Sequence, residues 1–276
     1  MFIIWVKKFA PKMVNISTAR SQLQENKKLY KHFSIDRMIL QMIDKNIFQA
    51  WYTTDLHPDV REKIESFKKM NPEYAYSLST DEDMDKFVNE NYIGAIADAY
   101  NRLNIIVAKV DFWRYLVLYK YGGVYLDMDS SIEKPLNQLI NDEDEAIITA
   151  EGNPVYYVQW ALIFSKRHPI LRRTIELILD NIKYNRFPNN IHEMTGPSVY
   201  TRAINEIHAG LFNNSTIIHR EINRKTDRTY KTSSVSYRVF GIDYSPFFNF
   251  KHDAVDLLYT GKKHWRQEQK EKNLLK

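Results

Sequence analysis

The chain has 276 residues, of which 39 are lysine or arginine and 34 are aspartate or glutamate, giving a formal charge of +5. Its hydrophobic content of 44% and charged content of 26% are close to those of globular proteins, which excludes a disordered or fibrous chain. The chain contains no cysteine, so disulfides, thiolate metal sites and a cysteine nucleophile are excluded. Any metal has to be bound by oxygen or imidazole ligands.

The basic residues are spread among the acidic ones, so the sequence predicts no nucleic-acid partner. The apolar start, MFIIWV, meets lysines after six residues, which is too short for a membrane span, and it lacks a small-residue cleavage site. We therefore expect a cytoplasmic protein without a signal peptide or transmembrane helix. A peripheral contact between this apolar start and a membrane stays open, with packing on the body of the protein as the alternative.

The first segment differs in character from the rest of the chain. Residues 18–44 mix apolar and charged side chains and contain no glycine or proline, which predicts one or two helices. We expect residues 1–44 to form an N-terminal helical extension, followed by one domain at residues 45–270.

The order of apolar runs and helical segments after this extension predicts an α/β fold. We expect strands at 46–52, 74–79, 124–129, 146–150 and 160–165, and helices at 58–70, 81–90, 105–121, 169–184 and 197–208. Residues 210–236 are polar and predict a loop region or a small insertion. Alternating strands and helices indicate a mostly parallel central sheet flanked by helices on both faces.

Two aspartates, Asp127 and Asp129, end one of these apolar runs. Alternate side chains of a strand point the same way and lie about 7 Å apart, so one cation or its waters can bridge the two carboxylates. Such ligands leave positions free for phosphate oxygens, as expected of Mg²⁺ or Mn²⁺ in a nucleotide site at a strand's carboxyl end. The alternative for an Asp-x-Asp pair is a solvated turn.

A second pair of charges, Asp111 and Arg114, lies in the segment predicted to form the long helix. Residues three positions apart share one helix face and can project together. Because this helix is otherwise apolar, we expect both charges to be buried, and buried charges need a partner or a function. The alternative is an ion pair on the helix surface.

Segments 110–115 (VDFWRY) and 122–129 (GGVYLDMD) resemble the hallmark of the DXD-containing glycosyltransferases of family 32. That family includes yeast initiating mannosyltransferases and bacterial capsule enzymes, and it is related to the catalytic domains of clostridial glucosylating toxins. The hallmark begins with serine, and here Val110 takes its place. The resemblance implies a GT-A-type, Rossmann-like nucleotide-sugar-binding domain with Mn²⁺ or Mg²⁺.

The resemblance also implies a reaction and the residues that carry it. The reaction is transfer of a hexose from a UDP-sugar or GDP-mannose to a glycan or protein acceptor, with retention of anomeric configuration, as in polysaccharide biosynthesis. Asp111, Arg114 and Asp129 are the expected catalytic residues, and Asp127 and Asp129 the expected metal ligands. Tyr125 is expected to lie with Asp111, Arg114 and Asp127 beside the donor, although an aromatic residue in a strand also fits a core position.

Two segments outside the hallmark extend the resemblance. The run NIFQAWY resembles the family's first strand and implies that Trp51 stacks on the nucleotide base, with a core position as the alternative. The run AVDLLYTGKKHWRQ resembles the family's closing segment. It implies His264 as the third metal ligand, with Asp256 as its substitute, and Trp265 at the donor. The lysines at 262–263 fit either phosphate contacts or a solvated tail.

Two further segments flank the predicted helices. The run WALIFSKRHPIL, which begins at Trp160, resembles the family's segment that ends in His-Pro. Where the family usually carries asparagine, this chain has Gln159 and Trp160. Thr195-Gly196-Pro197 matches the family's Thr-Gly-Pro and implies a close approach of backbone to substrate before a helix begins.

Two other functions compete with this interpretation. A phosphatase or phosphotransferase of the haloacid dehalogenase type also places Asp-x-Asp after an apolar strand. A non-catalytic carbohydrate-binding protein is compatible with the 18 tyrosines and 5 tryptophans, whose rings can stack on sugars. Neither function requires Asp111, Arg114, Asp127 and Asp129 to occur together.

Overall fold

The computed structural model describes residues 42–153, 155–212, 227–259 and 265–276. These residues belong to one compact unit, Gln41–Lys276. The expected helical extension at 1–44 lies almost entirely outside the described residues, so it stays a prediction together with its boundary. His264 and the lysines at 262–263 also lie outside them.

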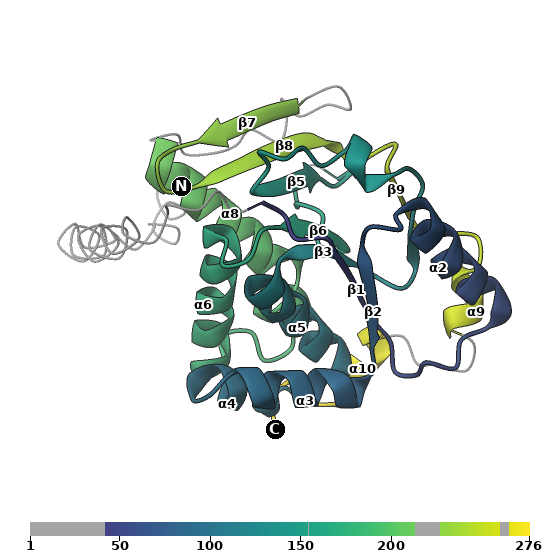
Figure 1. Cartoon of the computed structure of the whole chain (residues 1–276). Helices are drawn as coiled ribbons and strands as arrows, with labels where there is room; N and C mark the ends of the chain where they lie inside the picture. Colours follow the sequence, from purple (N-terminus) through teal and green to yellow (C-terminus); the bar gives the residue numbers. More distant parts are fainter. Residues whose placement is uncertain (1–41, 154, 213–226, 260–264) are drawn as a thin grey trace, which may run out of the picture. The chain divides into compact units, whose positions relative to one another are not determined.

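The centre of the domain is a seven-stranded sheet with the order β2-β1-β3-β6-β5-β8-β7 (Figure 1). Its strands are β1 (Asn46–Ala50), β2 (Ala75–Ser79), β3 (Gly123–Leu126), β5 (Ala146–Ala150), β6 (Ala161–Phe164), β7 (Asp227–Lys231) and β8 (Ser236–Ile242). β1 pairs in parallel with β2 and β3, and β5 pairs in parallel with β8, whereas β6 and β7 run antiparallel to their neighbours. The prediction of a mostly parallel central sheet is therefore confirmed.

Helices surround this sheet, and a small two-stranded sheet lies beside it. The helices are α2 (Pro58–Met70), α3 (Asp81–Asn91), α4 (Ala95–Arg102), α5 (Ile106–Tyr121), α6 (Pro169–Lys183), α7 (Ile191–Met194), α8 (Pro197–Phe212), α9 (Val255–Tyr259) and α10 (Trp265–Glu271). The small sheet pairs β4 (Ser130–Ile132) with β9 (Phe248–Phe250). None of the helices in the described part of the chain is long and apolar enough to cross a membrane.

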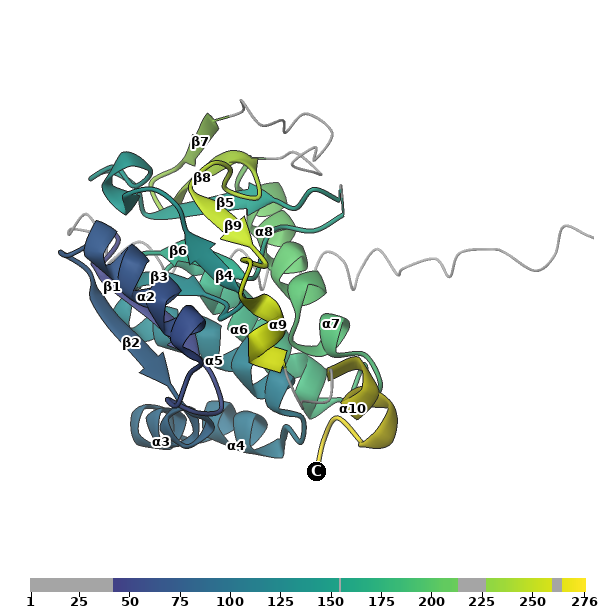
Figure 2. The same cartoon turned by 90° about the vertical axis from the view of Figure 1, so that its right-hand side faces the viewer.

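The two faces of the sheet pack against different helices, as strand alternation requires. Ile47 and Val124 on one face belong to a core cluster with Phe67 of α2. On the other face, the Tyr125 ring lies 6.3 Å from that of Trp113 in α5. Figure 2 places α9 beside α2, on the side of the sheet away from α5.

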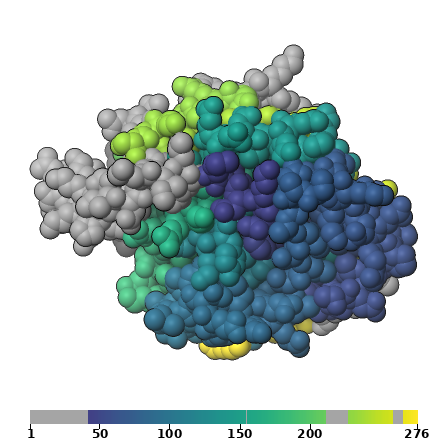
Figure 3. All heavy atoms as spheres, viewed as in Figure 1, coloured from purple at the N-terminus to yellow at the C-terminus, as the bar shows by residue number. Residues whose placement is uncertain are grey.

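Both ends of the described domain are tied to it. The start of the described chain, drawn in purple, reaches the surface between blue and teal segments (Figure 3). At the other end, the Gln269 side chain in α10 accepts a hydrogen bond of 2.8 Å from the amide of Ile191. Helix α10 therefore lies beside α7.

The predicted strands and helices are present, but eight of the helices and strands named above were not predicted: α4, α7, α9, α10, β4, β7, β8 and β9. Helix α4 was not predicted, because its eight residues are too few for a clear apolar repeat. Within the expected loop at 210–236, α8 continues to Phe212 and β7 begins at Asp227. Strand β7 is an edge strand with mostly exposed side chains, so it lacks the apolar alternation by which strands are recognised.

Gly123 allows β3 to lie close against β1, and it provides a test of this packing. Its φ is +112°, and a Cβ atom there would lie 2.6 Å from the backbone oxygen of Asn46. We expect Gly123→Ala to lower the free energy of unfolding by about 3 kcal/mol or more, from backbone strain and overlap together. Gly94 also has positive φ, +60°, but open space around it, so Gly94→Ala should cost about 1 kcal/mol. If urea unfolding showed that the two variants lose equal amounts of unfolding free energy, the close approach of β3 to β1 would not explain the effect of Gly123→Ala.

Candidate active site

The two motif aspartates lie in a turn at the carboxyl end of β3. The strand ends at Leu126, and the amide of Ser130 donates a 3.0 Å hydrogen bond to the backbone oxygen of Asp127. The expected strand through Asp129 was therefore too long, because the chain turns as soon as it leaves the sheet. The spacing expected from strand alternation does not apply to this pair.

Neighbouring strands hold the first residue of the turn. The amide of Asp127 donates to the backbone oxygen of Trp160 at 2.7 Å, just before β6. The Gln49 side chain in β1 donates to the backbone oxygen of Asp127 at 3.2 Å, and Tyr76 in β2 donates to Gln49 at 2.9 Å. The turn is thus fixed to three strands of the sheet through hydrogen bonds.

His252 holds the rest of the turn from the far end of the chain. It is buried, its amide donates to the backbone oxygen of Asp129 at 2.9 Å, and its Nε2 lies 3.1 Å from the backbone oxygen of Met128. Because Nδ1 accepts a hydrogen bond from the amide of Ala254, we assign the proton to Nε2, which then donates to Met128. Sequence inspection missed His252, since no motif surrounds it.

Arg114 joins the long helix to the turn. Its Nη2 lies 3.2 Å from Oδ1 of Asp111 and 3.1 Å from Oδ1 of Asp127. Its guanidinium carbon lies 4.6 Å from the centre of the Tyr125 ring, and the Tyr125 hydroxyl donates to Asp127 at 2.5 Å. The structure therefore brings these four predicted residues together, and it contradicts the alternative of a surface ion pair.

Asp111 is also held from two segments that lie far along the chain. Its Oδ2 accepts a 3.1 Å hydrogen bond from the Thr195 hydroxyl, and its Oδ1 accepts one of 3.3 Å from the Gln159 amide. The same Gln159 amide contacts the Tyr115 hydroxyl at 2.6 Å, and Gln159 offers its backbone oxygen to Arg114 at 3.2 Å. Gln159 is thus part of the site.

The burial of these charges changes their pKa values. Burial raises the pKa of Asp111 to about 6 and that of Asp127 to about 6, although Arg114 lowers both. Asp127 raises the pKa of Asp111, and Asp129 raises that of Asp127. Burial lowers the pKa of Arg114, but the nearby carboxylates outweigh this effect and raise it overall. The guanidinium therefore stays charged, while the carboxylates bind a proton more readily than exposed ones.

The donor atoms at the turn fit a hard divalent cation. Asp127 uses Oδ1 for Arg114 and Tyr125, and its side chain remains 29% exposed. Asp129 is buried, and its Oδ1 accepts from the Ser130 hydroxyl at 3.3 Å. Across the described residues, no group of three His, Asp or Glu side chains is placed to hold a metal. A cation here would therefore take several ligands from phosphate and water, as Mg²⁺ commonly does.

The predicted residues nearer the ends of the chain have different outcomes. Asp256 is an exposed residue of α9 and forms no metal-binding group with Asp127 and Asp129, so it is not supported as the substitute third ligand. His264 lies outside the described residues and stays a prediction. Trp265 is the first residue of α10, and its place at the donor is likewise untested.

Trp51 lies directly after β1, and its amide donates to the backbone oxygen of Ser79 at 2.9 Å. It is half-buried and packs against the core cluster, while its ring centre lies 5.2 Å from that of the half-exposed Tyr52. Both interpretations of Trp51, a base-stacking ring and a core residue, remain compatible with this position.

In the Thr-Gly-Pro segment, the need for glycine at position 196 has a local cause within the protein. A Cβ atom on Gly196 would lie 2.8 Å from the Cα of His192, so the close approach is to α7. The hydroxyl of Thr195, which bonds Asp111, links this segment to the site instead. The motif was noticed in the sequence, but its contact joins residues 84 positions apart, which local spacing cannot predict.

Residues 58–146 match the family described as "Glycosyltransferase sugar-binding region containing DXD motif". The matched range contains Asp111 and Arg114 of α5 and both aspartates of the turn. This part of the chain is therefore similar to a DXD-containing glycosyltransferase family. The resemblance expected from the sequence is thereby confirmed.

Relatives among curated proteins and solved structures agree with this assignment. The initiation-specific alpha-1,6-mannosyltransferase of Schizosaccharomyces pombe is 29% identical over 184 residues, covering 55% of this chain and 46% of the relative. The inositol phosphoceramide mannosyltransferase 2 of the same organism is 29% identical over 202 residues, covering 72% and 56%. The chain thus spans about half the length of such relatives.

A solved structure titled PaToxG Glycosyltransferase has a similar fold, with a TM-score of 0.52 and 21% identity. The likeness covers 71% of this chain and 81% of the other. At this identity, the comparison supports the glycosyltransferase fold and nothing finer.

The pairing of Arg114 with two buried carboxylates predicts a pH-dependent loss of stability in Arg114→Gln. Removing one partner of a buried ion pair costs about 3–5 kcal/mol. Without the guanidinium, the pKa values of Asp111 and Asp127 should rise further above their unfolded value. The folded variant then binds more protons than the unfolded chain, so its stability should fall as pH rises from about 5 to 8.

Arg173→Gln is the matched control, because Arg173 pairs with Glu206 and Glu176 and its side chain is 29% exposed. We expect Arg173→Gln to lower the free energy of unfolding by about 1 kcal/mol or less, and this loss should depend little on pH. Urea unfolding of both variants at pH 5 and pH 8 makes the comparison. If Arg114→Gln and Arg173→Gln lost equal amounts of unfolding free energy at pH 8, Arg114 would not be the residue that holds the site together.

Proposed function

We propose that this glycosyltransferase moves a hexose from a UDP-sugar or GDP-mannose to a glycan or protein acceptor, with retention of anomeric configuration. Residues 45–270 would form the transferase domain, and Mn²⁺ or Mg²⁺ would bind at Asp127 and Asp129. The main support is the contact of Arg114 with both Asp111 and Asp127 at the carboxyl edge of the sheet. Cytoplasmic location and peripheral membrane contact stay predictions.

Each proposed role follows from a contact that fixes the side chain. When bound, the cation would offset negative charge on the departing diphosphate. Arg114 is a planar donor suited to phosphate, and its two carboxylate contacts fix its direction. Asp111 is held by Arg114, Thr195 and Gln159, so its carboxylate is oriented to accept hydrogen bonds from donor hydroxyls.

Two positioning roles support this site. His252 and Gln49 bind backbone oxygens of the turn, so they keep Asp127 and Asp129 in place without contacting the donor. The motif match and the mannosyltransferase relatives favour this function over a phosphatase or a non-catalytic sugar-binding protein.

The metal assignment predicts different results for the two motif aspartates. Asp129→Asn should lower transfer by about 100-fold or more, because it removes a group that serves charge stabilisation. Its melting temperature should match that of the wild type. Asp127→Asn should lose activity and also stability, because Arg114 loses one of its two carboxylate partners.

The measurements are nucleotide-sugar turnover and the rise in melting temperature produced by Mn²⁺ with UDP or GDP. The rise should be present in wild type and in Asp142→Asn, an exposed control, and absent in Asp129→Asn. Near-normal turnover in the double variant Asp127→Asn/Asp129→Asn would contradict the assignment of these residues as metal ligands.

The base-stacking role predicts weaker donor binding in Trp51→Ala. Stacking of a base on an aromatic ring contributes about 1–3 kcal/mol in single-strand nucleic-acid binders, and we expect a loss of this size in affinity for UDP or GDP. Tyr184→Ala removes an exposed ring elsewhere and is the control. Unchanged affinity in calorimetry, together with a large fall in melting temperature, would mean that Trp51 is a core residue.

A further inference from the structure

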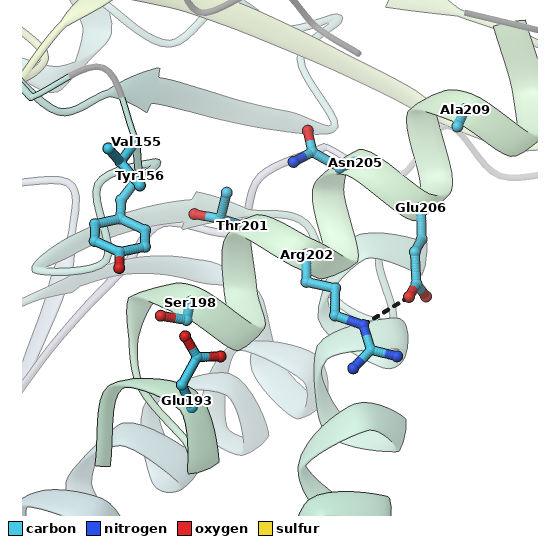
Figure 4. A pocket seen from close by; sticks show the side chains of 9 residues that line it. All are labelled: Val155, Tyr156, Glu193, Ser198, Thr201, Arg202, Asn205, Glu206 and Ala209. Atoms are coloured by element: carbon cyan, nitrogen blue, oxygen red, sulfur yellow. Dashed lines mark hydrogen bonds and ion pairs between the residues drawn. The ribbon is translucent and has the colours of Figure 1, made fainter. Parts of the chain in front are cut away.

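A groove lined by both polar and apolar groups lies along α8, opposite the loop that follows β5 (Figure 4). Its volume is about 570 Å³, within the range of about 300–1,000 Å³ typical of small-molecule sites. Tyr156, Glu193 and Ser198 face one another at one end, while Thr201 and Asn205 follow along the helix (Figure 4).

Residues that line the groove are close in the sequence to the two residues that hold Asp111. Glu193 and Ser198 lie on either side of Thr195 in the chain, and the Thr195 hydroxyl bonds Asp111. On the opposite wall, Tyr156 lies three positions before Gln159, which also bonds Asp111. A molecule in the groove would therefore contact the two chain segments that supply hydrogen-bond partners of Asp111.

Polar groups in the groove have no partner within the described part of the chain. Ser198 Oγ and Asn205 Oδ1 are buried atoms without a hydrogen bond there. The Glu193 side chain, although partly exposed, forms no ion pair with another described residue. Native proteins rarely leave buried polar atoms unpaired, so such a cluster calls for water or a ligand.

The charges of the groove indicate what kind of ligand suits it. Arg202 is paired with Glu206 at 2.8 Å, and Glu206 also holds Arg173 at 2.7 Å. Glu193 is therefore the charge available to a ligand. A carboxylate accepts hydrogen bonds from hydroxyls but repels an anion, and the Tyr156 ring adds an apolar face. These features suit a neutral polyhydroxyl compound better than a phosphorylated one.

We propose that this groove binds the acceptor, as a neutral hexose unit of a glycan whose hydroxyls donate to Glu193. The proposal rests on the proposed function, because an acceptor exists only if sugar is transferred. It adds the place and the charge of the acceptor, which neither the motif nor the relatives specify.

Binding and donor hydrolysis, measured separately, test the proposal. Saturation-transfer NMR with methyl glycosides of mannose, glucose and galactose, in the presence of Mn²⁺ and UDP or GDP, reports binding of neutral sugars. Inositol 1-phosphate is the anionic probe. Glu193→Gln and Tyr156→Ala are the test variants, and Glu90→Gln, an exposed carboxylate of α3, is the matched control.

We expect at least one methyl glycoside to bind wild type, and the dissociation constant to rise about tenfold or more in Glu193→Gln, as for loss of a hydrogen bond to a charged group. Tyr156→Ala should also weaken binding. Nucleotide-sugar hydrolysis, which needs no acceptor, should stay within twofold of wild type in both test variants, and Glu90→Gln should change neither measurement.

Three results would overturn the acceptor site: no glycoside binding, glycoside binding that both test variants leave unchanged, or tighter binding of inositol 1-phosphate than of any glycoside. A wild-type protein that binds glycosides but hydrolyses no UDP-sugar or GDP-mannose would instead refute the proposed function, and the acceptor role with it.

Discussion

The candidate site depends on one guanidinium that lies between two buried carboxylates. Arg114 comes from the helix before β3, and Asp127 from the turn after it, so the ion pair fixes the helix against the sheet where the motif lies. With Asp111, Asp127 and Asp129 ionised, this single positive charge leaves two negative charges uncompensated. A divalent cation carries the opposite charge, and without the arginine the three carboxylates would repel one another and bind protons more readily.

Sequence patterns were sufficient for the features that depend on neighbouring residues. The spacing of Asp111 and Arg114 on a helix, and of Asp127 and Asp129 after a strand, identified the three charges that ion pairs join, namely Asp111, Arg114 and Asp127, together with Asp129 in the same turn. The strand and helix order predicted the sheet, because each element carries its own apolar period. The predicted end of β3 was wrong. Asp127 and Asp129 continue the alternating pattern of a strand in the sequence, but the strand itself ends at Leu126.

The rest of the site could not be predicted, because it is assembled from contacts across long stretches of chain. Gln159 and Thr195 reach Asp111 across 48 and 84 positions, and His252 reaches Met128 across 124. Each is an ordinary polar residue in its local segment. The place of Gln159 follows from the order of strands in the sheet, which puts β6 directly beside β3. No local pattern in a single sequence contains that order.

The hold of His252 on the turn has a consequence for which residue can occupy the middle of the motif. The imidazole and its amide bind main-chain oxygens, and every amino acid supplies these alike. The hydrogen bonds that hold the turn therefore make no chemical demand on the side chain at position 128. That side chain is 4% exposed and belongs to the core cluster. Packing in the core therefore accounts for an apolar residue such as Met128 between the two aspartates.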